Sequence, residues 1–178
     1  MSKTKKEKVI NEKLADSIKR YTTYWSSFGA NWAAALYLAF IKKYGEEAKQ
    51  VAYDALKEHG RRFGEQISRT AKKRDLEAYD EIFLKPFYVV PGVGALPTIC
   101  YYSNTPSKLE FEATWCPVHE SWKMMGLRPE DMAEVAKLFC VAPDVGLQEV
   151  WNPKIKLKGP QEIKPRGDKR CYWCHEIE

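Results

Sequence analysis

Residues 109–115 read LEFEATW and decide the fold class. Apolar and polar residues alternate along this stretch, which is typical of a β-strand with one buried face. Another β-prone stretch, TICYY at 98–102, precedes it, and the turn residues Asn-Thr-Pro-Ser at 104–107 lie between the two. The pair predicts a β-hairpin.

Upstream of the hairpin, the apolar residues follow the period of a helix. The run from Tyr24 to Tyr44 predicts one helix, which Gly45 ends, and residues 46–74 predict a second helix whose apolar side includes a buried His59. We expect the two helices to pack together and to cover one face of the sheet. The predicted contact joins a buried stripe of Trp25, Phe28, Trp32, Leu36 and Phe40 to Val51, Leu56 and Phe63.

Downstream, helical segments separate the hairpin from the last strands. We predict helices near 119–125 and at 129–139, followed by strands near 155–157 and 171–177. This order indicates an α+β fold in which an N-terminal helical pair packs on a helix-interrupted antiparallel β-sheet, and it does not have the alternating rhythm of a Rossmann fold. We expect one domain over residues 24–178, preceded by a polar extension at 1–23.

The composition indicates the cellular compartment of the protein and limits the kinds of partner that it can bind. The longest apolar runs are shorter than the roughly 18 residues of a membrane span, and the charged N-terminus lacks a signal-type apolar block, so a cytoplasmic location is expected. In that compartment the 5 cysteines would be free thiols, nucleophiles or ligands and not disulfides. The net charge of +5 is spread along the chain, which disfavours nucleic-acid binding.

Cys116 lies where the LEFEATW strand ends and a helix is predicted to begin. A thiol at a helix N-terminus meets the positive end of the peptide dipoles, which favours the thiolate of a nucleophile or metal ligand. His119, three residues later, could add to this effect. A buried thiol at a strand end beside an exposed histidine is the alternative interpretation.

Cys140 follows the predicted 129–139 helix, and Asp144 follows Pro143, which we expect to stop that helix. The carboxylate would then lie on a turn near the thiol, where it could bind an amidine-like cation or move protons, or could merely cap the next turn. Asn152 could serve as an oxyanion donor or hold its loop.

The C-terminal segment GDKRCYWCHE at 167–176 contains the spacing C-x-x-C-H. Covalent haem attachment would need an export signal, and none is visible. Cys116 and His119 together with Cys171 and Cys174 make up the ligand count of a tetrahedral zinc site. Residues three apart on a strand point to opposite faces, however, so both late cysteines could reach one ion only through a bend.

Taken in order, several short motifs resemble the L-2-amino-thiazoline-4-carboxylic acid hydrolase family over residues 24–178. The motifs are WCP at 115–117, MGL at 125–127, LFC with a following Asp at 138–144, WNP at 151–153 and GDKRCYW at 167–173, together with YGEEA at 44–48 and the Gly60/Gly64 region. Pro143 and the pair Cys174-His175 depart from the family pattern.

The resemblance implies a hydrolase that opens a small cyclic amidine-type or amide-type ring at a C–N or C–S bond, on a fold similar to vinyl-reductase-type small-molecule-binding domains. Carried onto this chain, the resemblance points to Cys116, Cys140, Asp144, Asn152 and Cys171. We expect Cys140, Cys116 and Asp144 to be catalytic and Asn152, His119 and Cys171 to bind substrate, and we favour Cys140 as the nucleophile. We expect no cofactor and no resident metal, no membrane and no nucleic-acid partner, and we leave homo-oligomers open. A non-catalytic sensor or carrier that binds a small molecule or zinc is the alternative function.

Overall fold

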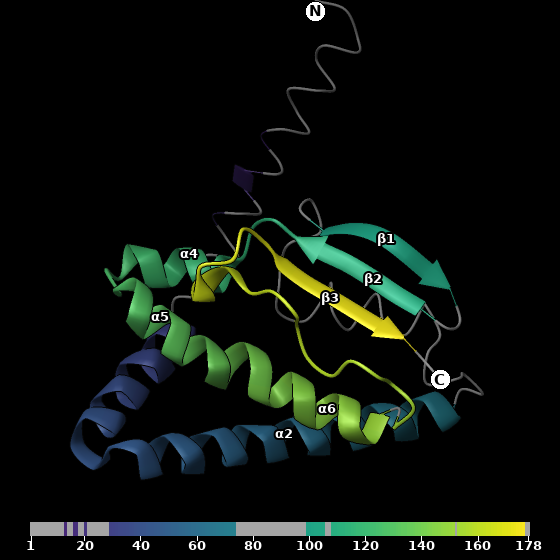
Figure 1. Cartoon of the computed structure of the whole chain (residues 1–178), viewed down its shortest axis with the longest axis horizontal. Coiled ribbons are helices and arrows are strands. Elements are labelled where there is room, and N and C mark those ends of the chain that lie inside the picture. The colour runs from purple at the N-terminus through teal and green to yellow at the C-terminus, as the bar shows by residue number, and fades with distance from the viewer. Residues whose placement is uncertain are drawn as a thin grey trace, which may run out of the picture.

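The computed structural model describes the chain at residues 13, 16–17, 20, 29–73, 99–105, 108–151 and 153–176. Helices come first, then a hairpin, more helices and a last strand, so the α+β class is confirmed (Figure 1). The order is a helix at 29–44, α2 (Glu46–Lys73), β1 (Ile99–Thr105), β2 (Lys108–Ala113), α4 (Pro117–Met124), α5 (Pro129–Ala136), a π-helical turn (Lys137–Val141), α6 (Ala142–Trp151), a 3-10 turn (Lys164–Arg166) and β3 (Cys171–Glu176).

The sheet has three antiparallel strands in the order β1-β2-β3, so the predicted hairpin is confirmed and helices interrupt the sheet in sequence. Ala113, which ends β2, pairs with Cys171, which begins β3. The strand expected near 155–157 is wrong, since this segment only lies beside β3, with the Lys156 N–H donating to the Glu176 carbonyl over 2.9 Å. Pro153 and Pro160 flank the segment and cannot donate to a ladder, which keeps the pairing short.

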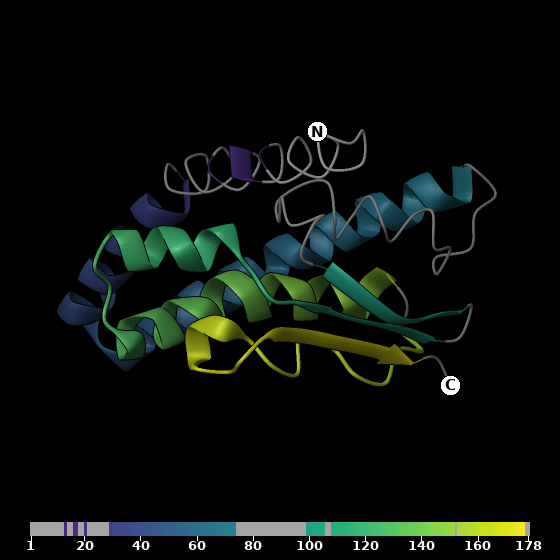
Figure 2. The ribbon, with the colours of Figure 1, turned by 90° about the horizontal axis from the view of Figure 1, so that it is seen from above.

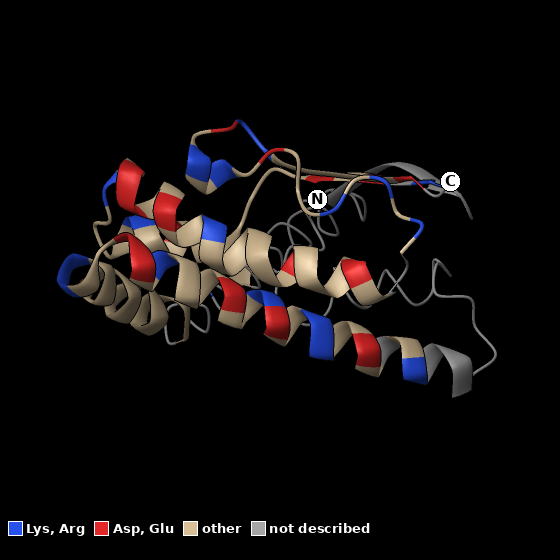
Figure 3. Cartoon of the chain, turned by 60° about the horizontal axis from the view of Figure 1, so that its bottom comes forward, with Lys and Arg blue, Asp and Glu red and all other residues tan. Residues whose placement is uncertain are grey.

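The helices form layers beneath the sheet. Figure 3 shows the sheet almost edge-on with α6 below it and α2 at the bottom, and Figure 2 shows α2 and α6 running side by side. The core between the layers joins the helix at 29–44, β2, β3 and the α4–α6 region. Its buried members are Ala34, Tyr37, Ala113, Trp122, Met132, Val135, Ala136, Leu138, Ile163 and Cys171.

The helix at 29–44 buries a different face from the one we predicted. Ala30, Ala34 and Tyr37 face the core. Trp32 and Leu36 are 67% and 72% exposed, so the expected buried stripe is wrong, and its first two members lie outside the described residues. The small alanines let the helix approach its neighbours closely, and this packing overrides the preference of larger side chains for burial.

In α2 the buried stripe also consists of small residues. Ala48, Gly60 and Gly64 are buried at multiples of four residues, whereas Val51 is 59% exposed and Phe63 is 39% exposed. His59 is exposed as well, so its predicted place in the core is wrong. Charged residues cover the outer side of this helix (Figure 3). The helix therefore packs against α6 with its smallest residues and not with its largest apolar side chains.

The glycines of α2 and α6 allow the backbones of these two helices to approach closely. A Cβ added at Gly60 would collide with the backbone of Pro143, and one added at Gly146 would collide with the backbone of Lys57. At Gly64 it would lie 2.5 Å from the Leu147 carbonyl oxygen. Glycine at these places is therefore a requirement of the α2–α6 contact.

Most of the polar extension predicted at 1–23 lies outside the described residues, which there include only 13, 16–17 and 20. Within the described segments, no helix is both long and apolar enough to cross a membrane.

His175 is fully buried on β3, on the same face of the strand as Cys171 and Trp173. Burial lowers the pKa of His175 to about 4, so the imidazole is neutral at neutral pH. In the unfolded chain a histidine has a pKa of about 6.5. The unfolded state therefore takes up a proton in acid before the folded state does.

We predict that acid destabilises the protein partly through His175. Above about pH 6.5, His175 contributes no pH dependence to the free energy of unfolding. As the pH falls from there to the folded pKa of about 4, the free energy of unfolding falls by up to about 3 kcal/mol. Denaturant unfolding at a series of pH values would measure this slope. The variant His175→Gln should flatten it, whereas His59→Gln, at an exposed position, should not. Parallel profiles for His175→Gln and the unmodified protein would contradict the prediction.

Candidate active site

Three thiols from three separate elements meet at one end of the sheet. Cys116 lies between β2 and α4, Cys140 lies in the π-helical turn, and Cys171 begins β3. Burial is the main cause that raises the pKa of Cys140, and ionisation of Cys116 or Cys171 would raise it further. Burial, followed by the influence of Cys116, raises the pKa of Cys171 to about 12. The three sulfur atoms are therefore close enough to sense one another, although Cys116 and Cys171 lie 55 positions apart in the chain.

Cys116 is the N-cap residue of α4, with extended backbone and Pro117 as the first helical residue. Proline suits this position because its missing N–H would be unpaired there in any case. Burial raises the pKa of Cys116, and the backbone N–H groups of His119 and Val118 oppose that rise without making a capping hydrogen bond. The positive charge of Lys164 also lowers this pKa.

His119 points a nitrogen into the protein. Its side chain is 13% exposed, and Nδ1 lies 3.7 Å from Glu120 Oε1, which is too long for a hydrogen bond. Among the described residues, Nδ1 is buried without a hydrogen-bond partner. Burial lowers the pKa of His119 and Lys164 lowers it further, so the ring is a neutral proton acceptor at neutral pH.

Asp144 lies near Cys140, but through a helix and not through the turn we predicted. The π-helical turn connects α5 to α6, and Pro143 is the second residue of α6. A π turn shifts the hydrogen bonds from the fourth to the fifth preceding residue, which provides room for a proline that an unbroken α-helix would reject. Asp144 follows Cys140 by four residues along this helical path, and its charge adds to the raised pKa of Cys140.

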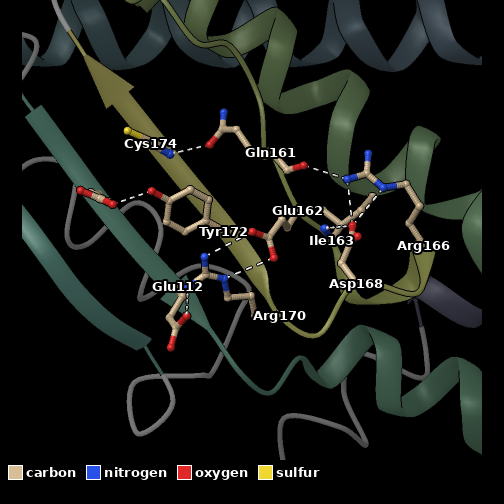
Figure 4. A network of polar contacts seen from close by, with 10 residues as sticks. Glu112, Gln161, Glu162, Ile163, Arg166, Asp168, Arg170, Tyr172 and Cys174 are labelled. Atoms are coloured by element: carbon tan, nitrogen blue, oxygen red, sulfur yellow. Dashed lines mark hydrogen bonds and ion pairs between the residues drawn. The ribbon is translucent and has the colours of Figure 1, made fainter.

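The motif GDKRCYW holds Cys171 in place by a polar network around β3 (Figure 4). Arg170 bridges Glu112 of β2 and Glu162 of the preceding loop, at 2.5 and 3.2 Å. Asp168 Oδ2 accepts the Ile163 N–H over 2.8 Å, which closes the turn before the strand. Because successive strand residues alternate between faces, Arg170 and Tyr172 make these outer contacts while Cys171 points into the core.

The zinc arrangement considered from the sequence is not present in the described residues. Cys174 and Cys171 have different neighbours. Burial is the main cause of the raised pKa of Cys174, and the other influences on it come from Lys108, Glu176 and Glu110. Nowhere in the described ranges do three or more His, Cys, Asp or Glu side chains form a group that could hold a metal ion. The two late cysteines lie on opposite faces of β3, as the strand geometry requires.

One position singled out from the sequence cannot be placed with the others, because Asn152 lies outside the described residues. One residue that sequence reasoning missed belongs near the thiols. The Lys164 N–H donates to Cys171 Sγ over 3.4 Å, and the lysine charge lowers the pKa of Cys116, Cys171 and His119.

Comparisons with known proteins bear on what this site does. The sequence profile described as L-2-amino-thiazoline-4-carboxylic acid hydrolase matches residues 25–174, which is most of the chain. No curated protein matches the sequence. Among solved structures, trafficking protein particle complex subunit 3 from Naegleria fowleri, covalently bound to palmitic acid, is 11% identical. The similarity covers 85% of this chain and 96% of that chain with a TM-score of 0.45, which is too low to support a fold or a function.

Proposed function

Since the chain belongs to the L-2-amino-thiazoline-4-carboxylic acid hydrolase family, which is named for a hydrolase, we propose that it hydrolyses a small cyclic amidine-type or amide-type ring with a cysteine nucleophile. The bond that breaks is a ring C–N or C–S bond. The observation that carries this proposal is the convergence of Cys116, Cys140 and Cys171, with Asp144 beside them, at one end of the sheet.

We assign the nucleophile to Cys116, which reverses the order favoured by the sequence alone. Burial, followed by the neighbouring Cys116, Cys171 and Asp144, raises the pKa of Cys140 well above the ordinary value. Burial and Glu120 also raise the pKa of Cys116, but the first backbone N–H groups of α4 and the charge of Lys164 act against that rise. We therefore expect Cys116 to lose its proton more readily than Cys140.

The proposed reaction has two stages, in which His119 handles protons and Asp144 orients the substrate. The Cys116 thiol gives its proton to His119, the thiolate adds to the electrophilic ring carbon, the ring bond breaks, and the departing heteroatom takes that proton from His119. Water then adds to the same carbon, transfers a proton through the neutral His119 imidazole, and releases the thiolate, so that one water is consumed. Asp144 holds the nitrogen side of an amidine through a charge-assisted hydrogen bond. Cys171 and Asn152 complete the proposed substrate contacts.

A cationic amidine would also help to generate the thiolate. The pKa values of all three thiols are raised mainly because burial disfavours the negative form. A positive ring bound among them compensates for this cost, since an opposite charge nearby favours ionisation. The site would therefore select rings that carry positive charge over neutral rings of the same size.

We expect the purified protein to open aminothiazoline rings faster than hydantoin-like rings, which are neutral amides. Chromatographic separation of ring and opened product, with thiol titration for the sulfur-containing rings, would measure both rates. A thermal-shift measurement on the same compounds would separate binding from turnover. Stabilisation by these rings without any opening would support a carrier and would refute the hydrolase proposal.

A further inference from the structure

The helix at 29–44 carries an apolar face that the fold leaves in contact with solvent. Trp32, Leu36, Phe40 and Tyr44 follow one another at four-residue intervals and are 67%, 72%, 47% and 53% exposed. The Phe40 and Tyr44 ring centroids are 4.6 Å apart, so the last two side chains of this face are in contact. No charged residue occurs between positions 29 and 41. A helix that is apolar on all sides is normally covered on all sides.

The area of this face suits an interface between two copies of the chain. Large apolar side chains present about 200 Å² each, so the exposed fractions leave about 500 Å² of apolar surface, near the largest patch found on typical monomers. Two such faces in contact would bury about 1,000 Å², which is the lower bound for a specific protein interface. Residues at four-residue intervals also form the ridges that pack into the grooves of a second helix.

The charges beside the face favour a second copy over a membrane surface. Lys42 and Lys43 end this helix, and Glu46 and Glu47 begin α2, directly across the turn at Gly45; all four residues are exposed. A surface that meets its own copy about a two-fold axis can place these lysines opposite the partner's glutamates. Anionic lipids would attract the lysines but would be repelled by the glutamates.

We propose that the Trp32–Tyr44 face is the interface of a homodimer, formed by two copies of the helix at 29–44. Trp32 and Leu36, the most exposed members of this face, lie on the side of the helix opposite the buried Ala34. An interface near the lower size bound predicts a dissociation constant in the micromolar range.

Sedimentation velocity and light scattering of the full chain test this proposal. From low micromolar to submillimolar concentration, the mass should rise from 20.6 kDa toward twice that value. Leu36→Glu should weaken the dimer on the order of 100-fold, because it places a charge in the centre of the interface. Leu36→Ala removes area without adding charge, so it keeps the test valid if the glutamate variant fails to fold. Leu157→Glu, at a 44% exposed leucine in another part of the fold, is the matched control and should leave the mass profile unchanged.

Circular dichroism and ring-opening activity would report whether each variant is folded. A chain that stays monomeric at all concentrations would overturn the proposal, and so would a dimer that tolerates both Leu36 substitutions. Flotation with vesicles of phosphatidylcholine and phosphatidylserine tests whether the face binds a membrane surface instead of a second copy. Vesicle binding by a monomeric chain that Leu36→Glu abolishes would assign the face to a membrane surface instead.

Discussion

Replacement of Cys116 by alanine is expected to lower the ring-opening turnover about a thousandfold or more, because the variant has no sulfur to form the covalent intermediate. The fold should survive, since Cys116 is only partly buried and alanine fills most of its volume. Turnover is measured with saturating substrate, and thermal unfolding shows whether the variant is intact. Cys174→Ala is the matched control, because this cysteine lies on the opposite face of β3 and should retain activity.

Alanine substitutions at the other two clustered thiols should have a much smaller effect than the one at Cys116. Alanine at Cys140 or Cys171 should lower turnover by about tenfold, as expected when a contact that shapes the pocket is lost while the chemistry remains. A Cys140→Ala variant that is inactive beside a Cys116→Ala variant that is active would return the nucleophile to Cys140. Normal turnover in all three variants would exclude cysteine catalysis.

Gly146→Ala is expected to destabilise the fold by more than about 3 kcal/mol, because the new methyl group has no space and meets a backbone that cannot rotate away. Its Cβ would collide with the carbonyl of Lys57 on α2. The two helices would have to separate, and α6 carries Asp144 close to Cys140. We therefore expect a lower midpoint in urea unfolding and a loss of activity even in the folded fraction.

Gly29→Ala is the control for this substitution. Gly29 is exposed at the start of the described part of the helix at 29–44, with no atom within 4 Å of its added Cβ. Alanine there should be neutral or slightly stabilising, because it restricts the unfolded chain. If both glycine variants had the same midpoint as the unmodified protein, the close α2–α6 contact would be wrong.

Local sequence signals were sufficient for the sheet and for the elements that hold the thiols. The alternation in LEFEATW predicts β2, and Pro117 and Pro129 each begin a helix at the place where proline is tolerated. These features depend on a few neighbouring residues, so they can be read without knowing the rest of the fold.

The buried faces of the first two helices could not be read in this way. No charged residue occurs between positions 29 and 41, so no charge marks the outer face of most of the helix at 29–44, and the larger side chains drew the prediction toward Trp32 and Phe40. In α2 the contact face is defined by glycines, which carry no hydrophobic signal. At the site, Lys164 was missed because its position depends on the loop before β3.

The central claim is that Cys116 forms a covalent bond with the ring carbon during turnover. The direct test is intact-mass analysis of protein quenched in acid during the reaction, followed by peptide mapping. Because ring opening leaves the substrate in one piece on the enzyme, a fraction of the protein should gain the full mass of the ring compound, located on Cys116 and absent from Cys116→Ala. An adduct on Cys140 or Cys171, or rapid turnover without any adduct, would contradict the account.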